Sequence, residues 1–266
     1  MFAGPNGSGK STITPIFQEI ADFPANYINP DEIALSLGGN IMERAYEASA
    51  IAANRRQECI ERGESFAFET VMSHPSKLAL LSKAKKAGFE ITVVFISTLN
   101  PEYNVGRVRQ RVVEGGHDVP TDKIVARYYR THSFLPKAAE IAQRTYIFDN
   151  TVTPQLGAVI ANGEIVQQND DSPQWIEDTL KGLGARSRER NFLRAQFSQK
   201  TLLPTNINEA RYTGTIELVG EHYVVQQVST TEIVLHDLCL IDLDLLVSQI
   251  VSIAYQDGVS SFVITE

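Results

Sequence analysis

A glycine-rich stretch near the start of the chain, residues 4–12, most constrains what the protein can fold into. Its letters, GPNGSGKST, fit the pattern G-x-x-x-x-G-K-[ST] of a phosphate-binding loop. Glycines let successive backbone N–H groups converge on phosphate oxygens, and the helix that follows points its positive dipole end at the same anion. The alternative is a chance glycine-rich turn. The presence of every fixed position, followed by helix-compatible residues 11–20, argues against it.

Each part of this loop has an expected role. The residues expected to bind the nucleotide are Gly4, Pro5, Asn6, Gly7, Ser8, Gly9, Lys10, Ser11 and Thr12. The Lys10 ammonium is expected to reach the β and γ phosphates, and the Ser11 hydroxyl is expected to ligate Mg²⁺. The sequence therefore predicts ATP or GTP, together with Mg²⁺, as the cofactors.

The strand that should carry this loop is short. Buried strands usually have about five residues, whereas only Met1, Phe2 and Ala3 precede Gly4. Two hypotheses follow: the native start lies upstream of Met1, or this copy has lost most of the strand. The intact mass of the natively expressed protein distinguishes them.

Strand-like and helix-like segments alternate after the loop. Residues 25–29, 64–70, 90–97 and 145–150 have the character of strands, and helical patterns lie between them. The run 90–97 is almost continuously apolar, which is typical of a parallel strand buried on both faces, and no acid closes it as a Walker B aspartate would. Such alternation predicts an α/β fold of the P-loop NTPase class, with a parallel sheet flanked by helices.

Asp31 is a candidate general base. In the segment Asn29-Pro30-Asp31, Asn29 suits an N-cap and Pro30 suits the first helical position, which leaves Asp31 without a structural task. A first-turn acid favoured by the helix dipole is the alternative. We favour the base, because open α/β sheets bind ligands at the carboxyl ends of their strands, where the phosphate-binding loop also lies.

Glu69 and Thr70 end the predicted strand 64–70 and are candidate substrate-binding residues. They are expected to hold sugar or nucleoside hydroxyls, with the positioning of Mg²⁺ as a second role for Glu69. A solvated strand end is the competing interpretation, although core strands seldom end on a buried Glu without a purpose. Asp149 ends the last predicted strand, and contact with a ligand and capping of the turn explain it equally well.

Arginines concentrate in residues 101–130 of an otherwise acidic protein with a formal net charge of −8. They are Arg107, Arg109, Arg111, Arg127 and Arg130. Two arginine-bearing helices joined by the glycine-containing turn 115–120 predict a lid that closes on a polyphosphate, because guanidinium groups stabilise a transferring phosphoryl group. A solvated basic helix pair is the alternative. His117 is expected to shape the turn rather than bind a metal, since no partner lies at ligand spacing.

The composition changes in the last third of the chain. Residues 1–183 are expected to form the first domain, with a final helix that ends near Leu183. Residues 184–210 are rich in arginine with little hydrophobic patterning, which suits a basic linker or an exposed helix. Residues 211–266 contain clustered β-branched residues and turn signals, which predict a small β-rich accessory domain.

Composition also excludes some classes of partner. An isoelectric point near 5.2 does not favour nucleic acid. Cys59 and Cys239 are far apart and lack metal-type spacing, so we expect reduced thiols in the cytoplasm. No run approaches the roughly 18 apolar residues of a membrane span, and no secretory signal is visible, so we expect a soluble cytoplasmic protein.

Together these motifs resemble the zeta toxin family of P-loop kinases over the first two-thirds of the chain. The resemblance is carried by residues 4–12, 29–31, 68–73, the arginine segment through 116–120 to 127–130, and 149–150. It implies an ATP- or GTP-dependent kinase with a nucleotide-kinase type of core. The acceptor implied is a hydroxyl of a sugar nucleotide such as UDP-N-acetylglucosamine, and the partner implied is a restraining antitoxin protein.

The same resemblance implies roles for individual residues. Asp31 would deprotonate the acceptor hydroxyl, while Glu69 and Thr70 would hold the acceptor. One of Arg111, Arg127 and Arg130 would neutralise the transferred charge, and the choice among them stays open. The short first strand and the extra C-terminal domain depart from the family pattern, and this branch of the family is open to a different acceptor.

The tail resembles a small domain of Kfr-type plasmid proteins, through residues 212–214, 226–227 and 235–237. This resemblance implies a mobile-element context and a fused domain that restrains the kinase internally or binds a partner. Two alternatives to the kinase of sugar nucleotides stay open. One is a nucleotide-binding regulatory or plasmid-maintenance module with weak or no kinase activity, and the other is a kinase of another metabolite.

Overall fold

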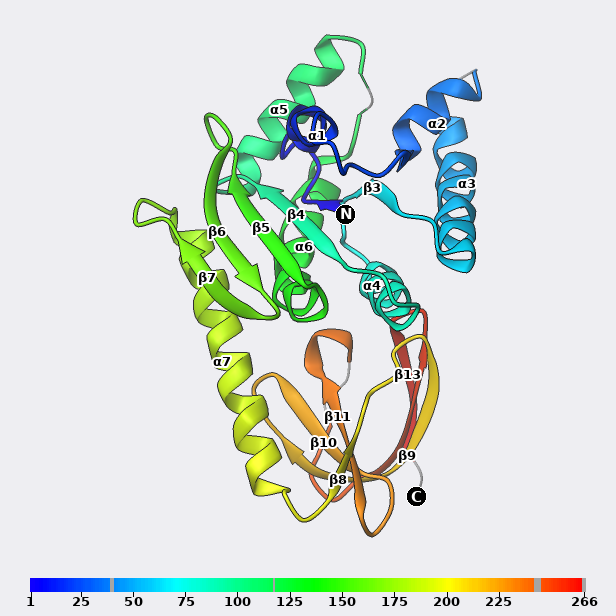
Figure 1. The fold of residues 1–266 in the computed structure, drawn as a ribbon, viewed down its shortest axis with the longest axis vertical. Helices are drawn as coiled ribbons and strands as arrows, with labels where there is room; N and C mark the ends of the chain where they lie inside the picture. The colour runs from blue at the N-terminus through cyan, green and yellow to red at the C-terminus, as the bar shows by residue number, and fades with distance from the viewer. Residues whose placement is uncertain (39–40, 117, 242–244, 265–266) are drawn as a thin grey trace. The chain divides into compact units, whose positions relative to one another are not determined.

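The computed structural model describes residues 1–38, 41–116, 118–241 and 245–264, without the side chains of 41–43 (Figure 1). The chain divides into two compact units. The first comprises Met1–Ser73 and Ala84–Glu177, and the second comprises His74–Lys83 and Asp178–Glu266. His117, for which the sequence predicted a turn-shaping role, lies outside the described residues.

The first unit is built on a seven-stranded sheet with the order β2-β3-β1-β4-β5-β6-β7. Its strands are β1 (Phe2–Ala3), β2 (Asn26–Ile28), β3 (Phe66–Thr70), β4 (Thr92–Ser97), β5 (Arg144–Asp149), β6 (Gln155–Ala161) and β7 (Glu164–Gln168). The first five pair in parallel, and β6 and β7 add an antiparallel hairpin. The predicted α/β fold with a parallel sheet is confirmed.

Helices flank this sheet (Figure 1). They are α1 (Lys10–Gln18), α2 (Pro30–Ser36), α3 (Ile41–Arg62), α5 (Pro101–Val113) and α6 (Thr121–Ile141), with α4 (Ser76–Lys86) and α7 (Gln174–Gln196) contributing to both units. Each of α1, α2 and α5 begins just after a strand of the sheet. This topology collects the phosphate-binding loop and the predicted site residues at the carboxyl ends of the strands.

The strand that precedes the loop is present but spans only Phe2 and Ala3. It lies at the centre of the sheet, where Phe2 pairs with Glu69 of β3 on one side and with Val94 of β4 on the other. The Met1 carbonyl accepts a hydrogen bond from the Val94 N–H at 2.8 Å, which extends the ladder by one residue. The two hypotheses about its origin stay predictions.

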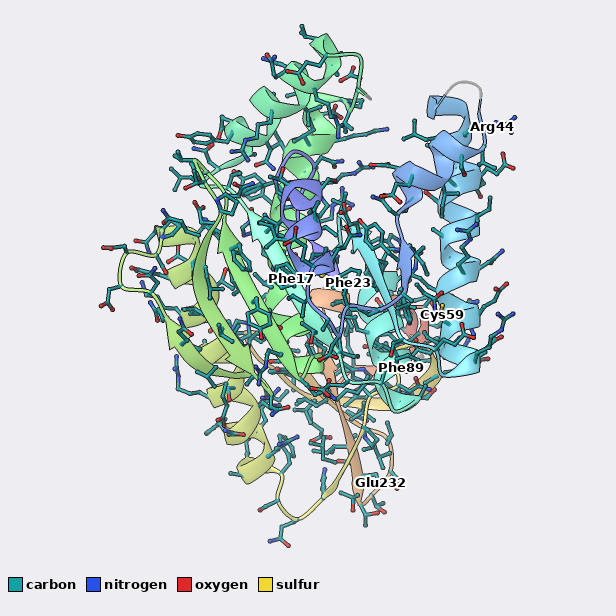
Figure 2. All side chains as sticks on the ribbon, turned by 45° about the horizontal axis from the view of Figure 1, so that its top comes forward. Phe17, Phe23, Arg44, Cys59, Phe89 and Glu232 are labelled. Carbon is teal, nitrogen blue, oxygen red and sulfur yellow. The ribbon has the colours of Figure 1, made fainter. Side chains whose placement is uncertain are left out.

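Aromatic side chains anchor α1 to the sheet below the loop. Phe2 and Ile13 belong to one buried cluster, against which Phe17 and Phe23 pack (Figure 2). The rings of Phe2 and Phe17 meet edge to face, with centroids 5.4 Å apart. An edge-to-face aromatic pair adds to the stabilisation from buried area. The packing fixes the direction of α1, and therefore of the loop at its N-terminus.

The second unit contains a six-stranded sheet with the order β13-β12-β9-β10-β11-β8. Its strands are β8 (Thr201–Leu203), β9 (Glu209–Val219), β10 (Tyr223–Gln227), β11 (Glu232–Asp237), β12 (Ile250–Gln256) and β13 (Val259–Ile264). All neighbours are antiparallel except β8 and β11, which are parallel. The predicted β-rich character of the C-terminal part is confirmed.

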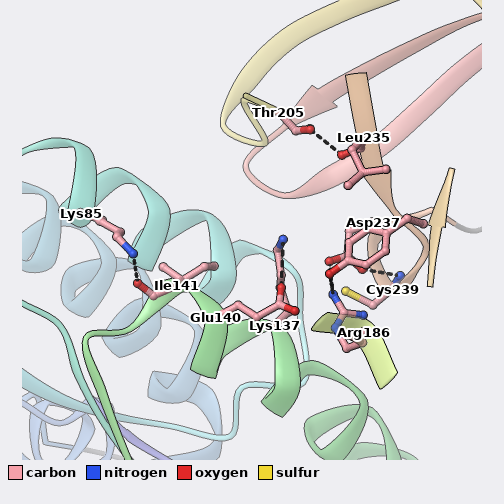
Figure 3. Close-up of polar contacts among 10 residues, drawn as sticks. Lys85, Lys137, Glu140, Ile141, Arg186, Thr205, Leu235, Asp237 and Cys239 are labelled. Atoms are coloured by element: carbon pink, nitrogen blue, oxygen red, sulfur yellow. Dashed lines mark hydrogen bonds and ion pairs between the residues drawn. The ribbon is translucent and has the colours of Figure 1, made fainter. Parts of the chain in front are cut away.

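Helix α7 extends to Gln196, so the predicted helix end near Leu183 was wrong. Its second half buries Leu193 against Tyr223, Val225 and Ile233 of the second sheet. Arg186 is also buried and forms an ion pair with Asp237 (Figure 3). Of the two alternatives for 184–210, the structure has a helix up to Gln196, followed by β8, rather than a linker. The domain boundaries at 183 and 210 stay predictions, which limited proteolysis tests.

Candidate active site

Residues 4–9 form a loop whose glycines are required by their backbone and by their neighbours. Gly7 and Gly9 have φ angles of 75° and 87°, a region that side chains rarely allow. A Cβ on Gly7 would lie 2.6 Å from the carbonyl oxygen of Asn104, and one on Gly9 would lie 2.1 Å from Nδ2 of Asn150. Gly9 is also the N-cap of α1 and brings no side chain over the first-turn N–H groups. This cradle fits a phosphate chain at a helix N-terminus.

Two buried asparagines brace the loop from outside. Asn104 of α5 donates from Nδ2 to the Asn6 carbonyl at 2.6 Å, and Asn150 donates from Nδ2 to the Ser8 carbonyl at 2.9 Å. These two bonds fix the carbonyls of Asn6 and Ser8, and the Ser8 N–H donates to the Pro5 carbonyl at 3.2 Å, so the loop is held in one shape before any anion binds. The role of Asn104 was not predicted, because one asparagine among arginines carries no pattern of its own. Asn150 was noticed only through the family resemblance.

Lys10 lies under the loop and turns back onto it. Its Nζ donates to the carbonyls of Gly4 at 2.8 Å and Pro5 at 3.0 Å. Burial lowers the pKa of Lys10 to about 8, while the nearby carboxylates of Glu69 and Asp31 act to raise this pKa and Arg111 acts to lower it. Glu69, Asp31 and Arg111 come from three separate elements, yet the charge of each influences the pKa of Lys10.

Glu69 is buried and is held by three hydroxyl groups. Its Oε2 accepts from the Ser11 hydroxyl at 3.2 Å, and its Oε1 accepts from Thr14 and Tyr27, each at 2.7 Å. Burial, followed by the hydrogen bond to Glu69, raises the pKa of Tyr27. Glu69 thus fixes the side chain that is expected to ligate Mg²⁺. Neither Thr14 nor Tyr27 was predicted, because only the fold brings them to Glu69.

Thr70 takes part in a tight turn after β3. Its hydroxyl oxygen accepts from the backbone N–H of Met72 at 3.1 Å, and Met72 has a positive φ of 56°. This contact shapes the chain that leaves the strand. Thr70 is half-buried, so part of its side chain still faces solvent at the carboxyl end of the sheet.

Asp31 lies in the first turn of α2 and is exposed. The predicted cap is confirmed: Asn29 precedes the helix, its Oδ1 accepts from the Asp31 N–H at 3.0 Å, and Pro30 is the first helical residue. The cap uses the backbone of Asp31 and leaves its carboxylate available. An exposed carboxylate that influences the Lys10 pKa suits a base that takes a proton from a bound hydroxyl.

The arginines separate into different groups. Arg127 of α6 donates from Nη1 to Asn6 Oδ1 at 3.2 Å, so it reaches the loop. The positive charge of Arg111 acts to lower the pKa of Lys10. Arg107 instead donates from Nη2 to the Thr151 carbonyl at 3.0 Å. Arg130 is exposed, and the structure does not bring it to the loop.

Asp149 caps the turn after β5. Its carboxylate accepts from the backbone N–H of Thr151 at 3.0 Å, from the Thr151 hydroxyl at 2.9 Å and from Trp175 Nε1 at 2.9 Å. These contacts correspond to the turn-capping alternative. They also fix residues 150 and 151 beside the loop.

Mg²⁺ would rely on few protein ligands. Among the described residues, no three carboxylate, histidine or cysteine side chains gather as a metal site. Mg²⁺ usually keeps several waters and takes one or two protein groups together with substrate phosphates. The Ser11 hydroxyl beside the Glu69 carboxylate fits that description.

Comparisons with known proteins bear on both units. Residues 43–157 match the zeta toxin family model. Residues 211–264 match the model of the KfrB domain. Both resemblances predicted from the motifs are thereby confirmed. The zeta toxin match contains Glu69, Thr70 and the arginines but begins after Lys10 and Asp31, whose assignment rests on the geometry described above.

Individual relatives are distant. An uncharacterized protein of Haemophilus influenzae is 29% identical over 128 residues, which cover 48% of this chain and 89% of that protein. A solved chain of the PezAT chromosomal toxin–antitoxin system of Streptococcus pneumoniae is 18% identical. It has a TM-score of 0.44, with 68% of this chain and 76% of that chain covered. In the described parts of the chain, no helix has the length and apolar content needed to cross a membrane.

Proposed function

We propose that the protein is a kinase of zeta-toxin type that transfers the γ-phosphoryl group of ATP or GTP to a hydroxyl of a sugar nucleotide such as UDP-N-acetylglucosamine. One observation carries this proposal: hydrogen bonds link Glu69 to Ser11 of the phosphate-binding loop and, through Tyr27, to the Asn29 cap that precedes Asp31, while Arg127 reaches Asn6 of the same loop. Phosphoryl transfer requires a base, a carboxylate that fixes the metal-binding hydroxyl, and a guanidinium. The zeta toxin match supports the same class.

The roles follow from the contacts of each side chain. ATP or GTP with Mg²⁺ would supply the phosphoryl group and the main positive charge beside it. Lys10 would exchange the carbonyls of Gly4 and Pro5 for phosphate oxygens. Glu69 would orient the Ser11 hydroxyl toward the metal. Its three hydroxyl contacts favour this role over that of holding the acceptor.

The acceptor is proposed to bind near Asp31 and Thr70. The Asp31 carboxylate would take the proton of the acceptor hydroxyl as the oxygen attacks phosphorus. Arg111 and Arg127 would offset the charge on the transferred group, and Arg130 would join them only if the lid moves. The rate enhancement would come mainly from positioning and charge stabilisation.

The test is transfer of label from γ-labelled ATP to UDP-N-acetylglucosamine in the presence of Mg²⁺, with Lys10→Ala as the control. Label on the sugar nucleotide that disappears in Lys10→Ala supports the proposal. Tight ATP binding without label on the sugar nucleotide would refute this acceptor. It would leave a kinase of another metabolite or a regulatory module.

The second candidate function is the nucleotide-binding regulatory or plasmid-maintenance module. The KfrB match favours it. The main proposal includes restraint of the kinase, either by an antitoxin protein or by the C-terminal unit of the same chain. It also includes a cytoplasmic location. Restraint is tested by comparing ATP turnover of the full chain before and after proteolytic cleavage between residues 197 and 200, where the chain leaves α7. An unchanged turnover would exclude internal restraint.

A further inference from the structure

Arg56 of α3 is buried although it carries a charge. The residue is only 5% exposed, and its guanidinium lies over the ring of Phe68, 5.2 Å from the centroid. It belongs to the buried stripe of α3, whose other members are small or apolar: Ala48, Ala52, Cys59 and Ile60. An arginine is almost never buried to this extent unless it is paired.

No acid of the described chain compensates this guanidinium. Among the described residues, no carboxylate forms an ion pair with Arg56, and no group accepts a hydrogen bond from it. Burial lowers the pKa of Arg56, and no neighbouring acid opposes this shift. A lone buried charge costs free energy of folding, so the packing of α3 on β3 does not account for an arginine at this position.

The tip of the Arg56 side chain is nevertheless not sealed in the core. Within the described parts of the chain, the fully buried side-chain atoms that lack a hydrogen-bond partner belong to other residues: Ser8, Thr145, Glu189 and His222. The nitrogens of Arg56 have no such partner either, so solvent must reach them. The apolar stem of Arg56 is therefore buried against Phe68, while its charged tip stays open to solvent.

Arg56 lies on the side of the sheet where the acceptor is proposed to bind. Phe68 and Thr70 share one face of β3, because side chains alternate along a strand. Only residues 63–65 join α3 to β3, so the helix runs back along the strand. Helical side chains lean toward the N-terminus of their helix, which directs Arg56 toward Thr70, about 7 Å beyond Phe68 at the usual rise of a strand. Helix α2, which carries Asp31, packs against α3 (Figure 1).

We propose that Arg56 binds a phosphate group of the acceptor, such as the diphosphate of a sugar nucleotide, and so selects a phosphorylated acceptor over a neutral one. This inference rests on the proposed function. A guanidinium presents parallel N–H donors that match the oxygens of phosphate or carboxylate. The ring of Phe68 fixes the guanidinium plane before the anion arrives. The anion then supplies the counter-charge that the protein lacks.

Isothermal titration of the full chain with UDP-N-acetylglucosamine tests the site, with saturating Mg²⁺-ADP present to occupy the phosphate-binding loop. Pyrophosphate and malonate are titrated in the same way, because they offer phosphate and carboxylate oxygens without a sugar or a base. The variants are Arg56→Met, which keeps an apolar stem on Phe68, and Arg56→Lys, which keeps the charge without the planar fork. Arg55→Met is the matched control, since Arg55 is exposed on the same helix.

Arg56→Met is expected to weaken the binding of UDP-N-acetylglucosamine and of pyrophosphate about 10–100-fold, as for the loss of a hydrogen bond to a charged group. Arg56→Lys should weaken both by less, and Arg55→Met should bind like the wild type. Malonate should bind weakly and equally to all of them. In thermal melting without ligand, Arg56→Met should be at least as stable as the wild type, because it removes an unpaired buried charge.

An unchanged affinity of Arg56→Met for UDP-N-acetylglucosamine would overturn the site, and a lower melting temperature with that result would assign Arg56 to the core. A loss confined to malonate would overturn the phosphate assignment. Equal losses in Arg56→Met and Arg55→Met would also overturn the site, because they would indicate a general effect of charge. The titrations require no phosphoryl transfer, so binding that depends on Arg56 without transfer of label would refute the proposed function alone.

Discussion

The buried ion pair between Arg186 and Asp237 makes α7 part of the second unit, and its removal should be costly. Both side chains are almost fully buried, at 6% and 5% exposure. Arg186 also donates to the Tyr223 hydroxyl at 3.3 Å and lies over the Tyr223 ring, 5.0 Å from its centroid. Asp237→Asn keeps the shape of the side chain but removes the carboxylate charge that pairs with the buried guanidinium. Breaking a buried pair in this way costs about 3–5 kcal/mol.

The assay is urea unfolding of the full chain followed by circular dichroism. With a slope near 2 kcal/mol/M, the transition of the second unit should shift to lower urea by roughly 2 M. Trp175 is the one tryptophan of the chain and reports on the first unit. The urea midpoint of its fluorescence transition should therefore be the same in the variant as in the wild type. Two transitions are expected, because two units need not unfold together.

Asp178→Asn is the matched control on the same helix. Asp178 lies 3.9 Å from Lys181, and both side chains are more than 60% exposed, at 64% and 68%. Exposed pairs contribute about 0–1 kcal/mol, so this variant should hardly change the midpoint. Arg186→Met combined with Asp237→Asn should recover much of the lost stability, since the double variant removes both charges of the pair. If Asp237→Asn cost no more than Asp178→Asn, the second half of α7 would not be part of the folded second unit.

Two further predictions concern the candidate active site. Asp31→Asn should lower turnover by about 10²–10⁴-fold, the usual contribution of a general base. The ATP affinity measured by titration should stay unchanged. An ATP affinity that falls in proportion to turnover would refute the role of Asp31 as the base. In the protein without nucleotide, the pKa of Lys10 is lowered to about 8, so its ammonium is present below that pH and lost above it. Phosphate binding requires the ammonium, so the ATP dissociation constant should rise by up to about tenfold per pH unit above 8, measured from pH 7 to 9.5. A constant value over this range would mean that the pKa of Lys10 is not lowered.

Local signals in the sequence predicted the local structure well. The loop and the Asn29 cap with Pro30 depend on residues a few positions apart. The end of α7 was misplaced for the opposite reason. Arg186 has the character of a solvated surface residue, and its burial depends on Asp237, which lies 51 residues away. A pattern of arginines therefore cannot distinguish an exposed helix from one that pairs its charge inside a core.

Glu69 shows the same limit within the candidate active site. The strand that contains Glu69 was predicted, and two roles were left open for its carboxylate: holding the acceptor or positioning Mg²⁺. The carboxylate accepts hydrogen bonds from Ser11, Thr14 and Tyr27, at separations of 58, 55 and 42 residues. Pairing of β1 with β3 brings α1 across the end of β3 and closes this contact. A carboxylate already holding three hydroxyl groups has little capacity left for an acceptor hydroxyl. The acceptor should therefore depend more on the surroundings of Asp31 than on Glu69, and Glu69→Gln should affect Mg²⁺-ATP more than the acceptor KM.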